Sequence, residues 1–230
     1  MPADSLLWSE LGWLFVLPFL VLLPLYLRAG NQQKFRRNTI LKLLLSGLCC
    51  LCAWLGWLLV SGAAQPSRWL IGLALAAGIV GDYYLQYIRH DIRKFVTGIV
   101  WFGLTQLLLT AWLLWQYGPS WWGLLITALI VAAVQLVIYQ QKWQMGAARW
   151  PLTIYMTLIS FMMSQAVLAL VRHQPPTLGM WLLAGGAVLF VLSDLLLGSS
   201  NYNSRLQKLH NPSLICYFLA ILLIALSNWY

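Results

Sequence analysis

Charged residues, and acidic ones above all, are scarce in this 230-residue chain. Only 8% of the residues are charged and only five are Asp or Glu, whereas 61% are hydrophobic. A soluble domain carries about 25% charged residues, so this composition excludes a water-exposed globular surface. Linkers and low-complexity tracts are also missing. We therefore predict a single all-α domain over residues 1–230, a polytopic membrane protein.

Metal-ligand patterns and a cleavable leader are absent as well. Cys49, Cys50 and Cys52 share one apolar run, and no cysteine has ligand spacing with a histidine. Cysteines in such a run usually serve as small apolar packing residues. We therefore expect no metal and no cofactor. The N-terminus has no basic segment before its first apolar run, and we interpret that run as a retained span.

Long apolar runs make up most of the chain. About 20 apolar residues cross a bilayer, and this rule predicts eight transmembrane helices. They lie at roughly 8–28, 39–60, 68–88, 94–116, 121–140, 150–171, 177–198 and 212–229. Asp82 and Asp194 are 112 residues apart (194 minus 82), and the same offset maps the first four spans onto the last four. This suggests a possible 4+4 parallel repeat, as some transporters have.

The basic residues are unevenly distributed between the two sides. Of the 14 Lys and Arg residues, all but Arg68 and Arg172 follow the first, third, fifth or seventh span. Basic loops face the cytoplasm, so we predict N-out/C-out orientation, in the inner membrane if the host is bacterial. Basic residues placed between spans do not indicate a nucleic-acid partner.

Two carboxylates lie inside predicted spans. Asp82 follows Gly81 and Asp194 follows Ser193, each in an apolar run. A charge in hydrocarbon costs about 2.5–3.5 kcal/mol even on lenient scales, so such residues suggest a functional site. The alternative is a purely structural ion pair or interhelical hydrogen bond.

Other polar side chains are expected near the depth of these acids, in the cytoplasmic half. Gln86 shares a helix face with Asp82 and Asn201 shares one with Asp194 if that helix continues, by the spacing of helical side chains. The full set of predicted binding residues is Lys42, Gln86, Gln106, Tyr155, Asn201 and Tyr217. Each has a structural alternative: a snorkelling lysine, an interfacial tyrosine or an interhelical amide contact.

At these residues the chain resembles the YhhN family of lysoplasmalogenase-like, eight-helix membrane proteins. Gly81-Asp82 and the later Phe95-x-x-Gly98-x-x-x-Phe102 are similar to the family's third and fourth helices. The most specific match is Gly186-Ala-Val-Leu-Phe-Val-Leu-Ser-Asp194 in the seventh span. Lys42 and Tyr217-Phe218-Leu219-Ala220 also match the family. The chain departs from the family at three positions: it has Leu43 where the family often has Pro, Gln106 where many members have His, and Ile221 where many have Gln.

The resemblance implies a hydrolase that cleaves the vinyl ether bond of lysoplasmalogens, with Asp82 and Asp194 as catalytic residues. The products would be a fatty aldehyde and a glycerophospho-alcohol. The partners implied are the lysophospholipid substrate and membrane lipids, and Lys42 is the first candidate for contact with the phosphate, ahead of Arg89 and Arg93. The resemblance fixes neither the headgroup nor the oligomeric state.

Two intramembrane acids suit this chemistry. A vinyl ether hydrolyses by protonation at carbon, and water then captures the oxocarbenium ion. The step needs a carboxylic acid still protonated near pH 7, which desolvation and a second nearby carboxylate favour. By analogy with glycoside hydrolysis we expect a carboxyl separation of roughly 5–9 Å. Which aspartate is the acid is left open.

Three other functions remain as alternatives. An intramembrane aspartyl protease would need Gly-x-Gly-Asp, but Ile79 stands where its first glycine belongs. A proton-coupled transporter would also use acids within the membrane. A non-catalytic lysolipid-binding protein is the third. A polar pocket open to one leaflet would favour a hydrolase, and a path open to both sides would favour transport.

Overall fold

A computed structural model describes residues 10–31, 35–61, 65–86, 91–143 and 145–230. Every secondary-structure element in these ranges is a helix, as predicted for an all-α fold. The long helices are α2 (Val16–Asn31), α3 (Phe35–Gly56), α4 (Trp69–Leu85), α5 (Ile92–Tyr117), α6 (Trp121–Gln140), α7 (Arg149–Arg172), α8 (Leu178–Tyr202) and α9 (His210–Leu226). The short ones are η1 (Gly12–Phe15), η2 (Trp57–Ser61), η3 (Pro66–Arg68), η4 (Gly146–Ala148), η5 (Ser204–Leu209) and η6 (Ser227–Trp229).

Within the described residues, seven helical stretches are long and apolar enough to cross a membrane. They contain α2, α3 and α5 to α9, and each coincides with one predicted span. The predicted span at 68–88 corresponds to α4, an apolar helix of 17 residues. At 1.5 Å per residue α4 is about 25 Å long, shorter than a hydrocarbon core of about 30 Å. The chain is thus a multi-pass membrane protein, and a count of eight crossings stays a prediction.

Local sequence signals set several helix ends. The Asp91 carboxylate accepts hydrogen bonds from the backbone N–H groups of Arg93 (2.9 Å) and Lys94 (3.3 Å), and so caps the start of α5. Gly118, with φ of 71°, ends the same helix. Thr177 caps α8 through the N–H of Met180. These caps fix where α5 and α8 begin, and both helices contribute to the site described below.

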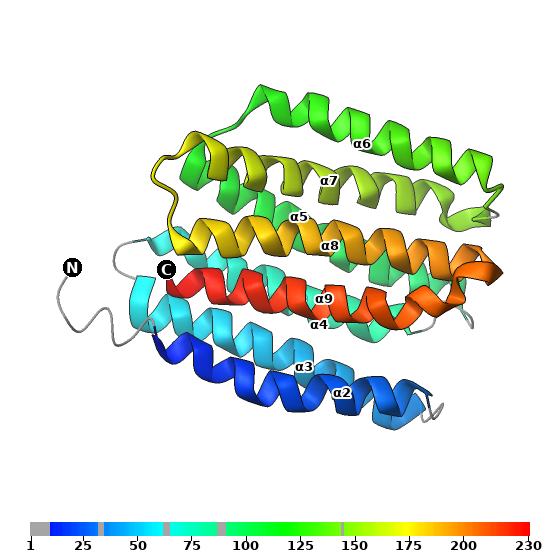
Figure 1. Ribbon diagram of the computed structural model, residues 1–230, viewed down its shortest axis with the longest axis horizontal. Helices are drawn as coiled ribbons and strands as arrows, with labels where there is room; N and C mark the ends of the chain where they lie inside the picture. Colours follow the sequence, from blue (N-terminus) through cyan, green and yellow to red (C-terminus); the bar gives the residue numbers. More distant parts are fainter. Residues whose placement is uncertain (1–9, 32–34, 62–64, 87–90, 144) are drawn as a thin grey trace.

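The long helices lie side by side in one bundle and alternate in direction (Figure 1). α2 and α6 stand at opposite edges, and the start of α2 and the end of α9 lie at the same end of the bundle. Glycine allows the closest packing: a Cβ added at Gly186 of α8 would lie 2.8 Å from Ile224 Cγ1 and 2.9 Å from the Ala220 carbonyl oxygen of α9. The internal repeat stays a prediction.

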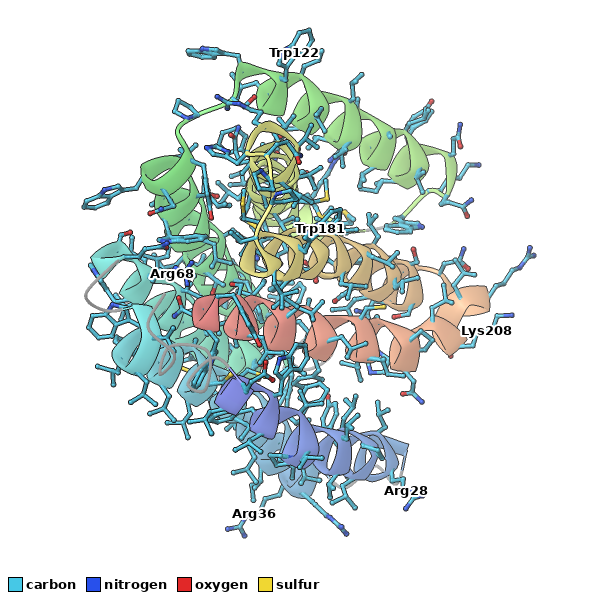
Figure 2. All side chains as sticks on the ribbon, turned by 60° about the vertical axis from the view of Figure 1, so that its left-hand side comes forward. Arg28, Arg36, Arg68, Trp122, Trp181 and Lys208 are labelled. Carbon is cyan, nitrogen blue, oxygen red and sulfur yellow. The ribbon has the colours of Figure 1, made fainter. Side chains whose placement is uncertain are left out.

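The two ends of the bundle differ in charge. Arg28 and Lys208 lie at one end, and Arg68, Trp122 and Trp181 lie at the other (Figure 2). Because the helices alternate, the first end, here called the basic end, also holds Arg36, Arg37, Arg93, Lys94, Lys142, Arg149 and Arg205. Lys34 and Arg89 lie outside the described residues. The charge difference agrees with the predicted orientation, which stays a prediction.

The end opposite the basic end is closed by buried hydrogen bonds. Arg68 is buried, and its Nη1 donates to the carbonyl oxygens of Ser227 (3.4 Å) and Asn228 (3.3 Å). A cation at the carboxyl end of a helix complements the partial charge of the last carbonyls. Asn228 Nδ2 donates to the Ala53 carbonyl (2.7 Å) and Trp229 Nε1 to the Cys52 carbonyl (3.0 Å). α3 and the short helices η3 and η6, which adjoin α4 and α9, are thereby joined at this end.

Candidate active site

Asp82, on α4, is held by partners from two other helices. Its Oδ1 lies 2.9 Å from the ammonium of Lys42 of α3, and the Lys42 side chain is itself buried. Its Oδ2 accepts hydrogen bonds from Ser46 Oγ and from Tyr217 Oη of α9, the latter at 2.7 Å. A fully buried carboxylate is stable only when it is paired and hydrogen-bonded. Asp82 meets both conditions.

Asp194, on α8, has a much sparser set of partners. Its Oδ2 accepts a hydrogen bond from Tyr155 Oη of α7, and no cation pairs with it among the described residues. Its side chain is partly exposed to the cavity described below, whereas Asp82 is fully buried. The two carboxylates thus differ in their surroundings: one is neutralised by a lysine and the other is not.

Phe102 of α5 packs between the two tyrosines that contact the carboxylates. Its ring makes edge contacts with Tyr155 (centroids 6.4 Å apart), Tyr217 (5.9 Å) and Phe190 (6.2 Å). A Cβ added at Gly81 would lie 2.6 Å from the Phe102 ring, so the glycine before Asp82 gives this ring its place. The sequence pair Gly81-Asp82 therefore positions both a carboxylate and the aromatic ring beside it.

One cavity, of about 110 Å³, reaches both carboxylates. Six of the predicted site residues line it: Lys42, Asp82, Tyr155, Asp194, Asn201 and Tyr217. Every lining residue on a helix comes from the half of that helix that lies toward the basic end, and Trp143 and Met145 come from the connection between α6 and α7. α8 continues to Tyr202, which brings Asn201 onto the helix and into the lining, as the spacing predicted. The remaining lining is mostly apolar, and most of it comes from α5, α6, α7 and α8.

Two predicted residues do not line this cavity. Gln86 donates to the Asp82 carbonyl oxygen (3.4 Å) and its Oε1 accepts from Thr39. Gln106 is fully buried in α5, near the Tyr155 hydroxyl, and its side-chain amide makes no hydrogen bond with the described residues. Their roles in substrate binding stay predictions.

Several residues of the site are missing from the sequence predictions. Ser46 bonds to Asp82 directly, and its position four residues after Lys42 on one helix face could have revealed it. Ser193, Ser213, Gln135 and Thr153 also line the cavity. Trp143, in the connection after α6, lines it too, and no periodic pattern points to a loop residue. Among the described residues, no group of three or more His, Cys, Asp or Glu side chains converges as a metal site requires.

These features define a class: a multi-pass α-helical membrane protein with two differently paired carboxylates in one cavity among its helices. The sequence matches the YhhN family over residues 37–228, a range that includes every residue of this site. The chain belongs to the YhhN family, and the resemblance drawn from Gly186–Asp194 and Lys42 is confirmed. No solved structure matches the chain.

Proposed function

We propose that this protein hydrolyses the vinyl ether bond of lysoplasmalogens by acid catalysis within the membrane. The observation that carries the proposal is the shared cavity, in which Asp82 is paired with a lysine and Asp194 is not. The reaction needs one carboxyl group that donates a proton and one that stays charged. Family membership supports a hydrolase-type membrane protein.

The different partners suggest a division of roles. Asp82 is the carboxylate that stays charged, because Lys42, Ser46 and Tyr217 all stabilise its negative oxygens. Asp194 is the proton donor, because its single described partner is the Tyr155 hydroxyl. Two carboxyl groups in unequal surroundings are the usual arrangement for such a pair of roles. Lys42, first considered for the substrate phosphate, instead acts through Asp82.

The reaction then proceeds in three steps. Asp194 transfers its proton to the vinyl carbon one removed from the ether oxygen, and the other vinyl carbon becomes an oxocarbenium ion. The Asp82 carboxylate stabilises this cation. Water adds to the cation and gives its proton to the Asp194 carboxylate, and the resulting hemiacetal breaks down to aldehyde and alcohol. One water is consumed, and Asp194 ends protonated, as it began.

The location of the cavity supports a hydrolase over a carrier. Its lining lies in the half of the bundle toward the basic end, and the opposite end is closed by the bonds of Arg68, Asn228 and Trp229. A site with access from one leaflet suits a lipid that enters and leaves on the same side. The apolar part of the lining suits a hydrocarbon chain.

Aldehyde release from a lysoplasmalogen by purified protein in detergent tests the proposal. Asp82→Asn and Asp194→Asn should each lower turnover by about a hundredfold or more. Asp91→Asn is the matched control, because Asp91 lies outside the cavity lining and asparagine retains the helix cap. A lysophospholipid with a saturated ether should release no aldehyde, because it has no vinyl carbon to protonate.

Other results would contradict the proposal. Wild-type turnover in either cavity variant would remove that aspartate from the mechanism. A protein that binds the lipid but releases no aldehyde would be a non-catalytic lysolipid-binding member of the family. Movement of the intact lipid across liposomes, driven by a proton gradient and without turnover in detergent, would identify a carrier instead.

A further inference from the structure

Trp143 lies in the connection between α6 and α7. Its ring stacks on that of Tyr202 at the end of α8, with centroids 5.7 Å apart and planes 22° apart. Both residues also line the cavity that holds the carboxylates. The stacked pair therefore spans the gap between the α6 side and the α8 side of the cavity.

Two further contacts hold this pair in place. A Cβ added at Gly198 would lie 3.4 Å from Cζ3 of Trp143, so the glycine gives the indole a place on the surface of α8. Asn203 Nδ2 donates to Gln141 Oε1 at 3.3 Å, which joins the same two segments a second time. Among the described residues, these side-chain contacts join the connection after α6 to the end of α8.

α6, which lines the cavity next to Trp143, has few contacts with long helices other than α7. α6 makes its main contact with α7, and of its residues only Gly123 and Thr127 are buried. Both buried residues lie near the start of α6, far along the helix from Val134, Gln135 and Ile138, which line the cavity. In a bilayer the exposed apolar face of α6 meets lipid tails, so the side of the cavity between α6 and α8 faces the membrane.

The indole of Trp143 also carries an unused hydrogen-bond donor. Its Nε1 is buried and has no hydrogen-bond partner among the described residues. A buried donor without a partner costs about 1–3 kcal/mol in a protein. An oxygen atom of a ligand bound in the cavity beside Trp143 would accept a hydrogen bond from this N–H group.

We propose that Trp143 is a gate through which a single-chain lipid reaches the carboxylates from the bilayer, between α6 and α8. The lipid displaces the indole ring from Tyr202, and the Trp143 N–H then binds an oxygen of the lipid's polar part. The choice of lipid rests on the proposed function, whereas the gate itself rests on the contacts of Trp143.

A reversible disulfide lock tests the gate. Gln141→Cys and Asn203→Cys, combined with Cys216→Ser, place two thiols where the wild-type side chains meet; the other cysteines are buried. The probe is a fluorescent lysophospholipid with a saturated ether, which binds but cannot be hydrolysed by protonation at a vinyl carbon. In bilayer nanodiscs the oxidised lock should slow probe association about tenfold or more, and a reductant should restore it.

Single substitutions separate the ring from its N–H group. Trp143→Ala should speed association, because it removes the barrier. Trp143→Phe keeps a stacking ring but has no donor, so association should match wild type and dissociation should be faster. Trp150→Ala is the matched control, since Trp150 lies at the same end of the bundle, is highly exposed and does not line the cavity.

The outcomes are distinct. Equal association rates for the oxidised and reduced lock, or no probe binding by the wild type, would overturn the gate. A Trp150→Ala variant that behaves like Trp143→Ala would overturn it too, and unchanged dissociation in Trp143→Phe would overturn the role of the N–H. If the lock behaves as expected but the wild type releases no aldehyde, the hydrolase proposal fails and the gate stands.

Discussion

Lys42 and Asp82 show what a single buried ion pair does for this site. Lys42 offsets the charge of Asp82, the only fully buried carboxylate among the described residues. A second carboxyl group can therefore lie in the same cavity without facing an uncompensated negative charge. In the proposed mechanism Asp194 then serves as the acid in the same cavity. The two proposed roles are separated by the partners of each side chain and not by the residue type.

Replacing Lys42 by methionine tests the pairing. The change keeps most of the side-chain volume but leaves Asp82 with an uncompensated buried charge, which costs about 3–5 kcal/mol. We expect a lower melting temperature in detergent together with lost turnover. Adding Asp82→Asn should restore much of the stability and none of the activity. A stable, active Lys42→Met variant would show that the pair is dispensable.

The two tyrosines should differ in importance. Tyr155→Phe removes the one described hydrogen bond of Asp194, so we expect kcat to fall by about a hundredfold through misplacement of the acid. Tyr217→Phe leaves Asp82 with Lys42 and Ser46 and should have a smaller effect. Steady-state kinetics of both variants on the same lysoplasmalogen give the comparison, and the reverse order would contradict the assigned roles.

At the residue scale, the sequence predicted the acids but only part of their surroundings. Asp82 and Asp194 could be found because a carboxylate in a hydrophobic span is costly. The pairing of Lys42 with Asp82 depends on how α3 and α4 are rotated against each other. Hydropathy alone does not determine that rotation.

At the scale of elements, glycine contacts determine how closely neighbouring helices approach. Gly186 meets both a side chain and a backbone carbonyl of α9, whereas a Cβ added at its neighbour Gly185 would lie 3.8 Å from Leu223. A side chain would therefore clash with α9 at position 186, whereas at position 185 it would make an ordinary van der Waals contact.

Gly186→Ala should therefore destabilise the protein by about 1–3 kcal/mol through overpacking, and Gly185→Ala should have little effect. Thermal unfolding of both variants in one detergent measures the difference. Equal melting temperatures would mean that α8 and α9 shift apart without cost. The test concerns packing alone, because neither glycine lines the cavity.

Helix lengths show where sequence prediction of the elements succeeded and where it was limited. The apolar runs placed all eight long helices, because hydropathy over about 20 residues is a strong signal. The end of α8 was less certain: polar residues after Gly198 ended the predicted span, yet the helix continues to Tyr202. That extra turn brings Asn201 and Tyr202 to the cavity.

At the scale of the whole molecule, the charge difference between the ends predicts orientation. Cysteine introduced at Trp181 or Lys208, both exposed, can be labelled with a membrane-impermeant maleimide in the Cys216→Ser background. We expect labelling at position 181 on intact cells and at position 208 only after permeabilisation. The opposite pattern would reverse the predicted N-out/C-out topology.

α6 gives the molecule an unusual mechanical property. One side of the cavity is lined by α6, a helix that packs mainly on α7 and that would expose its other faces to lipid in a bilayer. The lateral pressure of the surrounding acyl chains would therefore act directly on the width of the cavity. If the proposed hydrolase activity holds, reconstitution in bilayers of graded chain length and unsaturation should change turnover in steps that follow packing stress, and turnover would then report the physical state of the membrane.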